Sequence, residues 1–113
     1  MGYRSDVGFA CTPAVHDVIK GVATMMDSFK QLLNDADDLA PSHVREGRYR
    51  WESVKYYDGY EEVDTLNRLM DFFDNCGLDT EYGLIRIGEE LDDITYKGCP
   101  HDFDLFVNRS LDI

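Results

Sequence analysis

Hydrophobic positions near the start of the chain change from a strand-like period to a helical one. Alternate residues of segment 5–11 are apolar: Val7, Phe9 and Cys11. Pro13, which suits the first position of a helix, follows this segment. Apolar residues then recur at spacings of three and four, namely Val15, Val18, Ile19, Val22, Met25, Met26, Phe29, Leu32 and Leu33. The pattern predicts a strand over 5–11 and one amphipathic helix over 13–33.

The alternating pattern returns over residues 48–57, but its phase changes once. Tyr49 and Trp51 share one parity, whereas Val54 and Tyr56 fall on the other. A β-bulge near Ser53 explains such a change, and so does a strand that is covered on both faces. We predict a strand here and leave the two explanations open.

The second half of the chain contains one more helical stripe, followed by short strand-like segments. The stripe consists of Val63, Leu66, Leu69, Met70, Phe73 and Cys76. Gly77 follows it, at the position where a left-handed residue commonly ends a helix. Segments 82–87, 94–96 and 103–107 are rich in β-branched, aromatic and alternating apolar residues. The sequence therefore predicts a second helix and then three strands.

The element order β-α-β-α-β-β-β predicts an α+β fold in one domain that spans residues 1–113. We expect an antiparallel or mixed sheet of four or five strands, with two helices packed on one face. The length of 113 residues fits a single hydrophobic core. The expected core includes Val18, Val22, Phe29, Leu66, Leu69 and Phe73.

Composition limits the class of protein and the cellular compartment that we expect. Hydrophobic residues make up 43% of the chain, enough for a folded domain, and no apolar run approaches the roughly 20 residues of a membrane helix. Three cysteines at irregular separations fit reduced thiols better than a disulfide framework. Asp6 stands where a secretory signal would place basic residues. We therefore expect a cytoplasmic protein with no membrane partner.

Motifs that carry chemistry do not emerge from the sequence. The acidic segment 35–38 lacks the glycine and distal glutamate of a calcium-binding EF-hand loop. His16 and His43 stand alone, and His101 follows Cys99 across a proline without a third group to orient a base. The glycines match no phosphate-binding loop. We expect no enzyme activity, no metal and no cofactor.

The net charge of −12 is concentrated in one stretch of the chain. Residues 58–104 hold 14 acidic and 3 basic residues, whereas residues 1–57 hold 8 acidic and 7 basic ones. Such a charge opposes direct binding to nucleic acid. One interpretation is a solvated surface that keeps the protein soluble. The other is a row of carboxylates that imitates nucleic-acid phosphates and binds a protein with a basic groove.

The second interpretation assigns specific residues to a partner-binding surface. Four acids share one sector of the second helix, opposite its apolar stripe, and four more crowd the turn after segment 82–87. The predicted partner-binding residues are Glu61, Asp64, Asp71, Asp74, Glu89, Glu90, Asp92 and Asp93.

An alternative site is a small pocket for a nucleotide or another anion. Aromatic walls with a few cations are typical of such pockets, and aromatic residues alternate with arginines in segment 48–57. The residues predicted for this pocket are Arg50, Trp51, Tyr56 and Tyr57.

Several segments resemble a group of small phage and prophage proteins of unassigned function. They are 1–7 (MGYRSDV), 53–60 (SVKYYDGY), 83–89 (GLIRIGE) and 108–110 (NRS). The resemblance implies a phage origin and assigns no functional residue. Small acidic phage proteins often inhibit nucleic-acid enzymes or defence complexes of the host, as anti-CRISPR proteins do. We therefore expect a phage-encoded acidic inhibitor, with a phage structural or assembly part as a further alternative.

Overall fold

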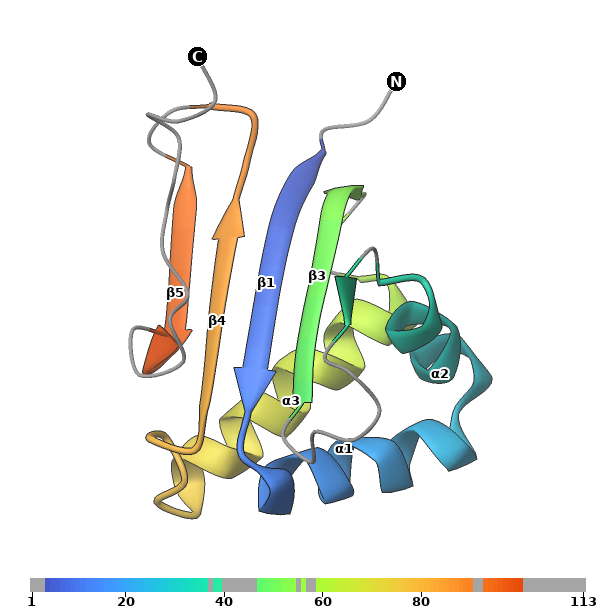
Figure 1. The fold of residues 1–113 in the computed structure, drawn as a ribbon, viewed down its shortest axis with the longest axis vertical. Coiled ribbons are helices and arrows are strands. Elements are labelled where there is room, and N and C mark those ends of the chain that lie inside the picture. The colour runs from blue at the N-terminus through green and yellow to red at the C-terminus, as the bar shows by residue number, and fades with distance from the viewer. Residues whose placement is uncertain are drawn as a thin grey trace.

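An antiparallel sheet with helices on one side forms the fold (Figure 1). The computed structural model describes residues 4–36, 38–39, 47–54, 56, 59–90 and 93–100. Within them the elements are β1 (Ser5–Cys11), α1 (Pro13–Met25), α2 (Asp27–Asn34), β2 (Asp38–Leu39), β3 (Gly47–Val54), α3 (Glu61–Asn75), β4 (Tyr82–Ile87) and β5 (Ile94–Gly98). The strand order is β2-β3-β1-β4-β5, and every neighbouring pair is antiparallel. The α+β class and the antiparallel sheet are confirmed.

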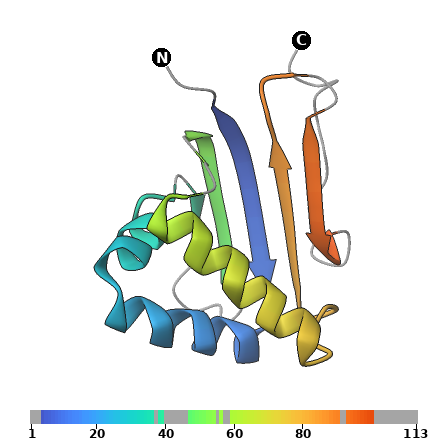
Figure 2. The same ribbon diagram turned by 180° about the vertical axis from the view of Figure 1, so that it is seen from behind.

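The helices of the described part cover one face of the sheet, as the two opposite views show (Figures 1 and 2). The central strand β1 sends Val7, Phe9 and Cys11 into the core, as its alternation predicted. Leu66 and Phe73 of α3 pack onto this face and are fully buried. Burial of these apolar side chains stabilises the pairing of helix and sheet.

The prediction of one helix over 13–33 is wrong, so the described part contains three helices rather than two. Met26 has φ −135° and ψ 107°, an extended conformation that ends α1 and begins α2. The break changes the direction of the chain, and Phe29 of α2 becomes fully buried. Val18, predicted for the core, is instead 43% exposed, while Val22 is partly buried.

Of the two explanations for the phase change in segment 48–57, the structure supports a β-bulge near Ser53. Ser5 of β1 pairs with Val54 of β3, but Val7 pairs with Trp51, so β3 contains one extra residue between these pairs. The bulge returns Val54 to the same face as Trp51, and both Val54 and Tyr56 pack against the core. This explains the change of phase in the sequence.

The second predicted helix and the two strands after it agree with the structure in position. Leu69 is partly buried, and Gly77 adopts a φ of 77° after the end of α3. The predicted strand 82–87 coincides with β4, and 94–96 lies within β5. The predicted strand 103–107 lies outside the described residues. No helix of the described part is both long and apolar enough to cross a membrane.

Candidate functional site

The predicted acidic residues occupy three separate places in the fold. Glu61 and Asp64 lie in the first turn of α3, Asp71 and Asp74 lie near its carboxyl end, and Glu89, Glu90 and Asp93 lie between β4 and β5. The length of β4 separates the second group from the third, and six strand residues span about 20 Å. Asp92 lies outside the described residues. The structure therefore does not join these acids into one continuous surface.

The acids at the amino end of α3 have local partners. Glu61 accepts a hydrogen bond from the Ser28 hydroxyl, which ties α3 to α2. The Gly59 backbone N–H donates to Asp64 Oδ1 at 2.9 Å. Carboxylates at the amino end of a helix also lie at the positive end of its dipole. These contacts therefore give Glu61 and Asp64 a structural role within the fold.

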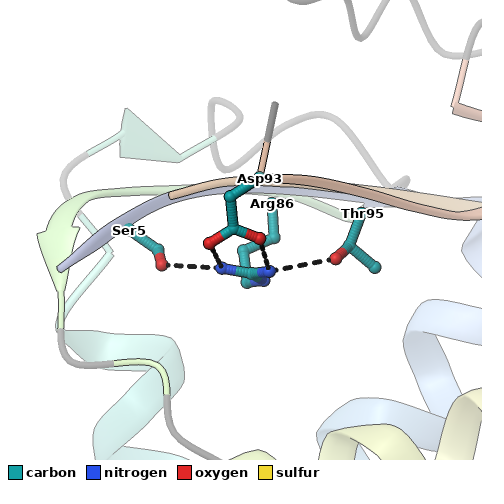
Figure 3. A network of polar contacts seen from close by, with 4 residues as sticks. All are labelled: Ser5, Arg86, Asp93 and Thr95. Carbon is teal, nitrogen blue, oxygen red and sulfur yellow. Dashed lines mark hydrogen bonds and ion pairs between the residues drawn. The ribbon is translucent and has the colours of Figure 1, made fainter. Parts of the chain in front are cut away.

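Asp93 belongs to a polar network on the face of the sheet that carries the helices (Figure 3). The Arg86 guanidinium donates to both carboxylate oxygens of Asp93, at 2.7 and 3.4 Å. It also donates to the hydroxyls of Ser5 and Thr95, each at 3.1 Å. The Arg86 and Asp93 side chains are only 19% and 33% exposed. The network connects the start of β1 to the β4–β5 turn, so Asp93 has a structural role.

Glu89 and Glu90 are both exposed in the β4–β5 turn. Glu89 accepts a hydrogen bond from the backbone N–H of Arg4, next to the start of β1. This contact joins the β4–β5 turn to the start of β1, in addition to the Arg86 network.

At the carboxyl end of α3, carboxylates surround a buried tyrosine. The Tyr82 hydroxyl donates to Asp74 Oδ1 at 2.8 Å, and the Tyr82 side chain has no exposed surface. Burial raises the pKa of Tyr82, and so do this hydrogen bond and the negative charges of Asp74, Asp71 and Asp79. We call Asp71, Asp74 and Asp79 the carboxyl-end acidic surface. Asp79 was missed in the sequence because it follows the helix rather than lying on it.

The position of the carboxyl-end acidic surface is electrostatically unfavourable. The last turn of α3 contains no basic residue, although the carboxyl end of a helix dipole favours cations. The sequence has no Lys or Arg between Arg68 and Arg86. None of the three aspartates forms an ion pair with a described residue. Apart from the Tyr82 hydroxyl on Asp74, the described residues therefore offer these charges no ion-pair partner.

Comparison of the chain with known proteins identifies no relative. No protein-family model matches the sequence, and no curated protein or solved structure shows significant similarity to it.

The residues predicted for a small-molecule pocket do not converge. Trp51 is 1% exposed, and its indole N–H donates to the Leu32 carbonyl at 2.8 Å, so it is a core residue. Arg50 is the next residue of the same strand, so it points to the opposite face of the sheet, where it is exposed and pairs with Glu52. Tyr56 packs against the core, and Tyr57 lies outside the described residues. Arg50 and Trp51 therefore cannot line one pocket.

A half-buried polar cluster joins β1, α1 and β3. His16 Nε2 lies 2.7 Å from the Tyr49 hydroxyl, and the rings meet edge to face. Burial, followed by the charge of Cys11, raises the pKa of Tyr49 to about 12. A Cβ atom on Gly47 would lie 2.6 Å from the His16 ring and 2.8 Å from Cys11 Sγ, so only glycine fits there.

This cluster lacks the features of a reactive site. Cys11 has no exposed surface, whereas reactive cysteines are partly exposed in electropositive surroundings. Among the described residues, no group of three or more His, Cys, Asp or Glu side chains could hold a metal ion. Cys99, which the sequence analysis considered together with His101 and rejected as a reactive site, is half-buried, and its backbone N–H donates to the Tyr82 carbonyl. His101 lies outside the described residues.

Proposed function

We propose that the protein is a non-enzymatic inhibitor that binds the basic, nucleic-acid-binding groove of a host enzyme or defence complex. The carboxyl-end acidic surface, Asp71, Asp74 and Asp79, is the proposed contact. The observation that supports this proposal is the gathering of these carboxylates at the negative end of α3, where the last turn contains no basic residue and no described residue forms an ion pair with them. A basic partner would supply the missing counter-charges.

Phosphate mimicry accounts for this use of carboxylates. A groove that binds nucleic acid presents Lys and Arg side chains to phosphate oxygens, and exposed aspartates offer the same negative oxygens on a folded scaffold. Asp71, Asp74 and Asp79 are all exposed. The net charge of −12 favours fast association with a basic protein and opposes binding to nucleic acid itself. The resemblance of the sequence to small phage proteins supports a bacterial host as the source of the partner.

The test begins with affinity purification from a nuclease-treated bacterial lysate. The baits are the wild type, the double variant Asp71→Asn/Asp79→Asn and the control Asp17→Asn/Asp27→Asn, which removes the same charge from α1 and α2. Asp74 is kept because it binds Tyr82. We expect a nucleic-acid-binding protein that the wild type and the control retain and the double variant loses.

The captured protein is then mixed with its nucleic acid and increasing amounts of each variant. The wild type and the control should displace the nucleic acid, and displacement should weaken as salt rises, since screening shortens electrostatic attraction. Equal displacement by Asp71→Asn/Asp79→Asn, with an unchanged fold by circular dichroism, would contradict the proposed contact. Capture of no nucleic-acid-binding protein would contradict the proposed function itself.

A further inference from the structure

The outer side of α1 carries a second apolar row, distinct from the one that packs onto the core. Val15, Ile19 and Ala23 of this helix are buried. The other row is exposed at every position and consists of Ala14, Val18, Gly21 and Met25. Val18 is 43% exposed and Met25 is 79% exposed, and both are among the large apolar side chains that the described part leaves open to solvent. We call these four residues the α1 seam.

The spacing of the α1 seam is that of a coiled-coil contact. Its members follow one another at intervals of four, three and four residues, which are the intervals between a and d positions of heptads. Such residues lie along one stripe of a helix and pack against a second helix. No described helix lies on this stripe, because its four residues are exposed. Among the described residues, the seam therefore has no partner helix.

The sizes of the seam residues indicate what completes the pair. If a second copy of α1 runs antiparallel about a two-fold axis between residues 19 and 20, Val18 faces Gly21 of the second copy. The same axis places Met25 opposite Ala14. Each large side chain then meets a small one, so the seam is complementary to itself, as an interface between identical subunits requires. We propose that α1 pairs with α1 of a second copy of this chain.

Local charge also favours a second copy at this helix. Two molecules that each carry −12 repel each other over most of their surfaces. Within α1 the charges cancel, since Lys20 lies 4.0 Å from Asp17 and no other Asp, Glu, Lys or Arg occurs between Pro13 and Met25. The seam itself contains no charged residue. Two copies that meet along the seam therefore bring no net charge of α1 into contact.

One helix pair is smaller than a permanent interface. A stable dimer buries about 800 Å² per partner, more than four side chains of one short helix provide. We therefore expect a reversible dimer, with a dissociation constant in the micromolar to millimolar range. Higher salt should strengthen it, because salt screens the repulsion between the subunits and leaves the apolar contact intact.

Sedimentation equilibrium from micromolar to millimolar concentration tests this dimer in the full chain. Gly21→Val enlarges the residue that faces Val18 and should weaken the dimer by about tenfold or more. A Cβ atom at Gly21 meets nothing within 4 Å in the monomer, so the fold accepts this change. The double variant Val18→Ala/Gly21→Val again places a large residue opposite a small one and should restore dimerisation. Met25→Lys should abolish it, and Tyr96→Ala, which changes an exposed aromatic of β5, should not alter it.

Three results would overturn the proposal. The first is a monomer at millimolar concentration. The second is a dimer that Gly21→Val and Met25→Lys leave unchanged. The third is a failure of rescue: Gly21→Val weakens the dimer, but the double variant Val18→Ala/Gly21→Val does not restore it. Size complementarity across the seam would then play no part in the dimer.

Discussion

Neutralising the carboxyl-end acidic surface should make the protein more stable. In Asp71→Asn/Asp79→Asn, two side chains keep their size and lose their charge. Both charges act on the same buried hydroxyl of Tyr82, and Asp71 lies about one turn from the negative end of α3. Most substitutions of a folded protein destabilise it. A gain in stability is therefore a specific expectation of the electrostatic argument.

The size of the gain follows from two effects. An unfavourable charge near a helix end costs about 0.3 to 1 kcal/mol at low ionic strength. Two unit charges about 8 Å apart in water repel by roughly 0.5 kcal/mol before salt screening. Together these give about 0.8 to 1.5 kcal/mol without salt, and we expect screening to reduce the rise in the free energy of unfolding to about 0.5 to 1 kcal/mol. In a domain of this size the midpoint of thermal unfolding should rise by about 2 to 6 °C.

The same chemical change at the other end of a helix provides the control. Asp27 lies in the first turn of α2, where a carboxylate is favourable, so Asp27→Asn should lower stability by about 0.3 to 1 kcal/mol. Urea unfolding at low salt should show opposite signs for the two variants, and both effects should shrink at about 1 M salt, where the Debye length is about 3 Å. If Asp71→Asn/Asp79→Asn loses stability while Asp27→Asn behaves as expected, the acids are not repulsive where they stand. The argument for a basic partner then fails.

Three further predictions concern a core leucine, two glycines with positive φ, and Tyr49. Leu66→Ala removes a fully buried side chain and should lower the free energy of unfolding by about 2 to 5 kcal/mol in urea titrations; an unchanged midpoint would contradict its burial. Gly98 and Gly77 both have a positive φ, of 65° and 77°. A Cβ added at Gly98 would lie 2.4 Å from the Tyr82 carbonyl oxygen, whereas one added at Gly77 would have no atom within 4 Å. Gly98→Ala should therefore destabilise the fold more than Gly77→Ala. Thermal unfolding compares the stability of the two variants. Equal losses of stability would show that the backbone around Gly98 moves to relieve the close contact with Tyr82. Burial raises the pKa of Tyr49 from 10 to about 12, so the folded state keeps this proton to a higher pH than the unfolded chain does. The free energy of unfolding should therefore fall between about pH 10 and 12. Tyr49→Phe should reduce that fall.

The periodic segments allowed much of the fold to be predicted. Alternation over 5–11 and the stripe of α3 each correspond to one arrangement of side chains, and the structure has that arrangement. The phase change near Ser53 was compatible with two arrangements, and only the strand pairing distinguishes them. The break at Met26 left no such mark. Apolar residues continue through it without interruption, and neither proline nor glycine stands there. α1 has apolar residues on two sides. In the sequence, its buried row and the α1 seam therefore looked like a single apolar stripe that continued into α2.

The candidate sites were harder to predict because they depend on which segments meet in space. A helical projection correctly placed acids on α3, but it could not show that β4 separates them from the β4–β5 turn. Asp79 joins Asp71 and Asp74 only through the turn between α3 and β4. Trp51 and Arg50 are neighbours in sequence, yet alternation along β3 places them on opposite faces. Composition therefore suggested kinds of residue without their arrangement.

The central position of β1 has a consequence for how the chain folds. This strand comes first in the chain, but its neighbours β3 and β4 come much later, and Ser5 bonds to Arg86 across 81 positions. At a synthesis rate of about 5 to 20 residues per second, roughly 4 to 16 s pass between the appearance of β1 and that of β4. During that time the edge of β1 that pairs with β4 has no partner strand, and Val7 and Phe9 lack the core side chains that β4 supplies. Such distant pairing is typical of slow folding. A nascent chain that stops before β4 should therefore bind chaperones that recognise exposed apolar strands, and release from them should require the residues up to Ile87.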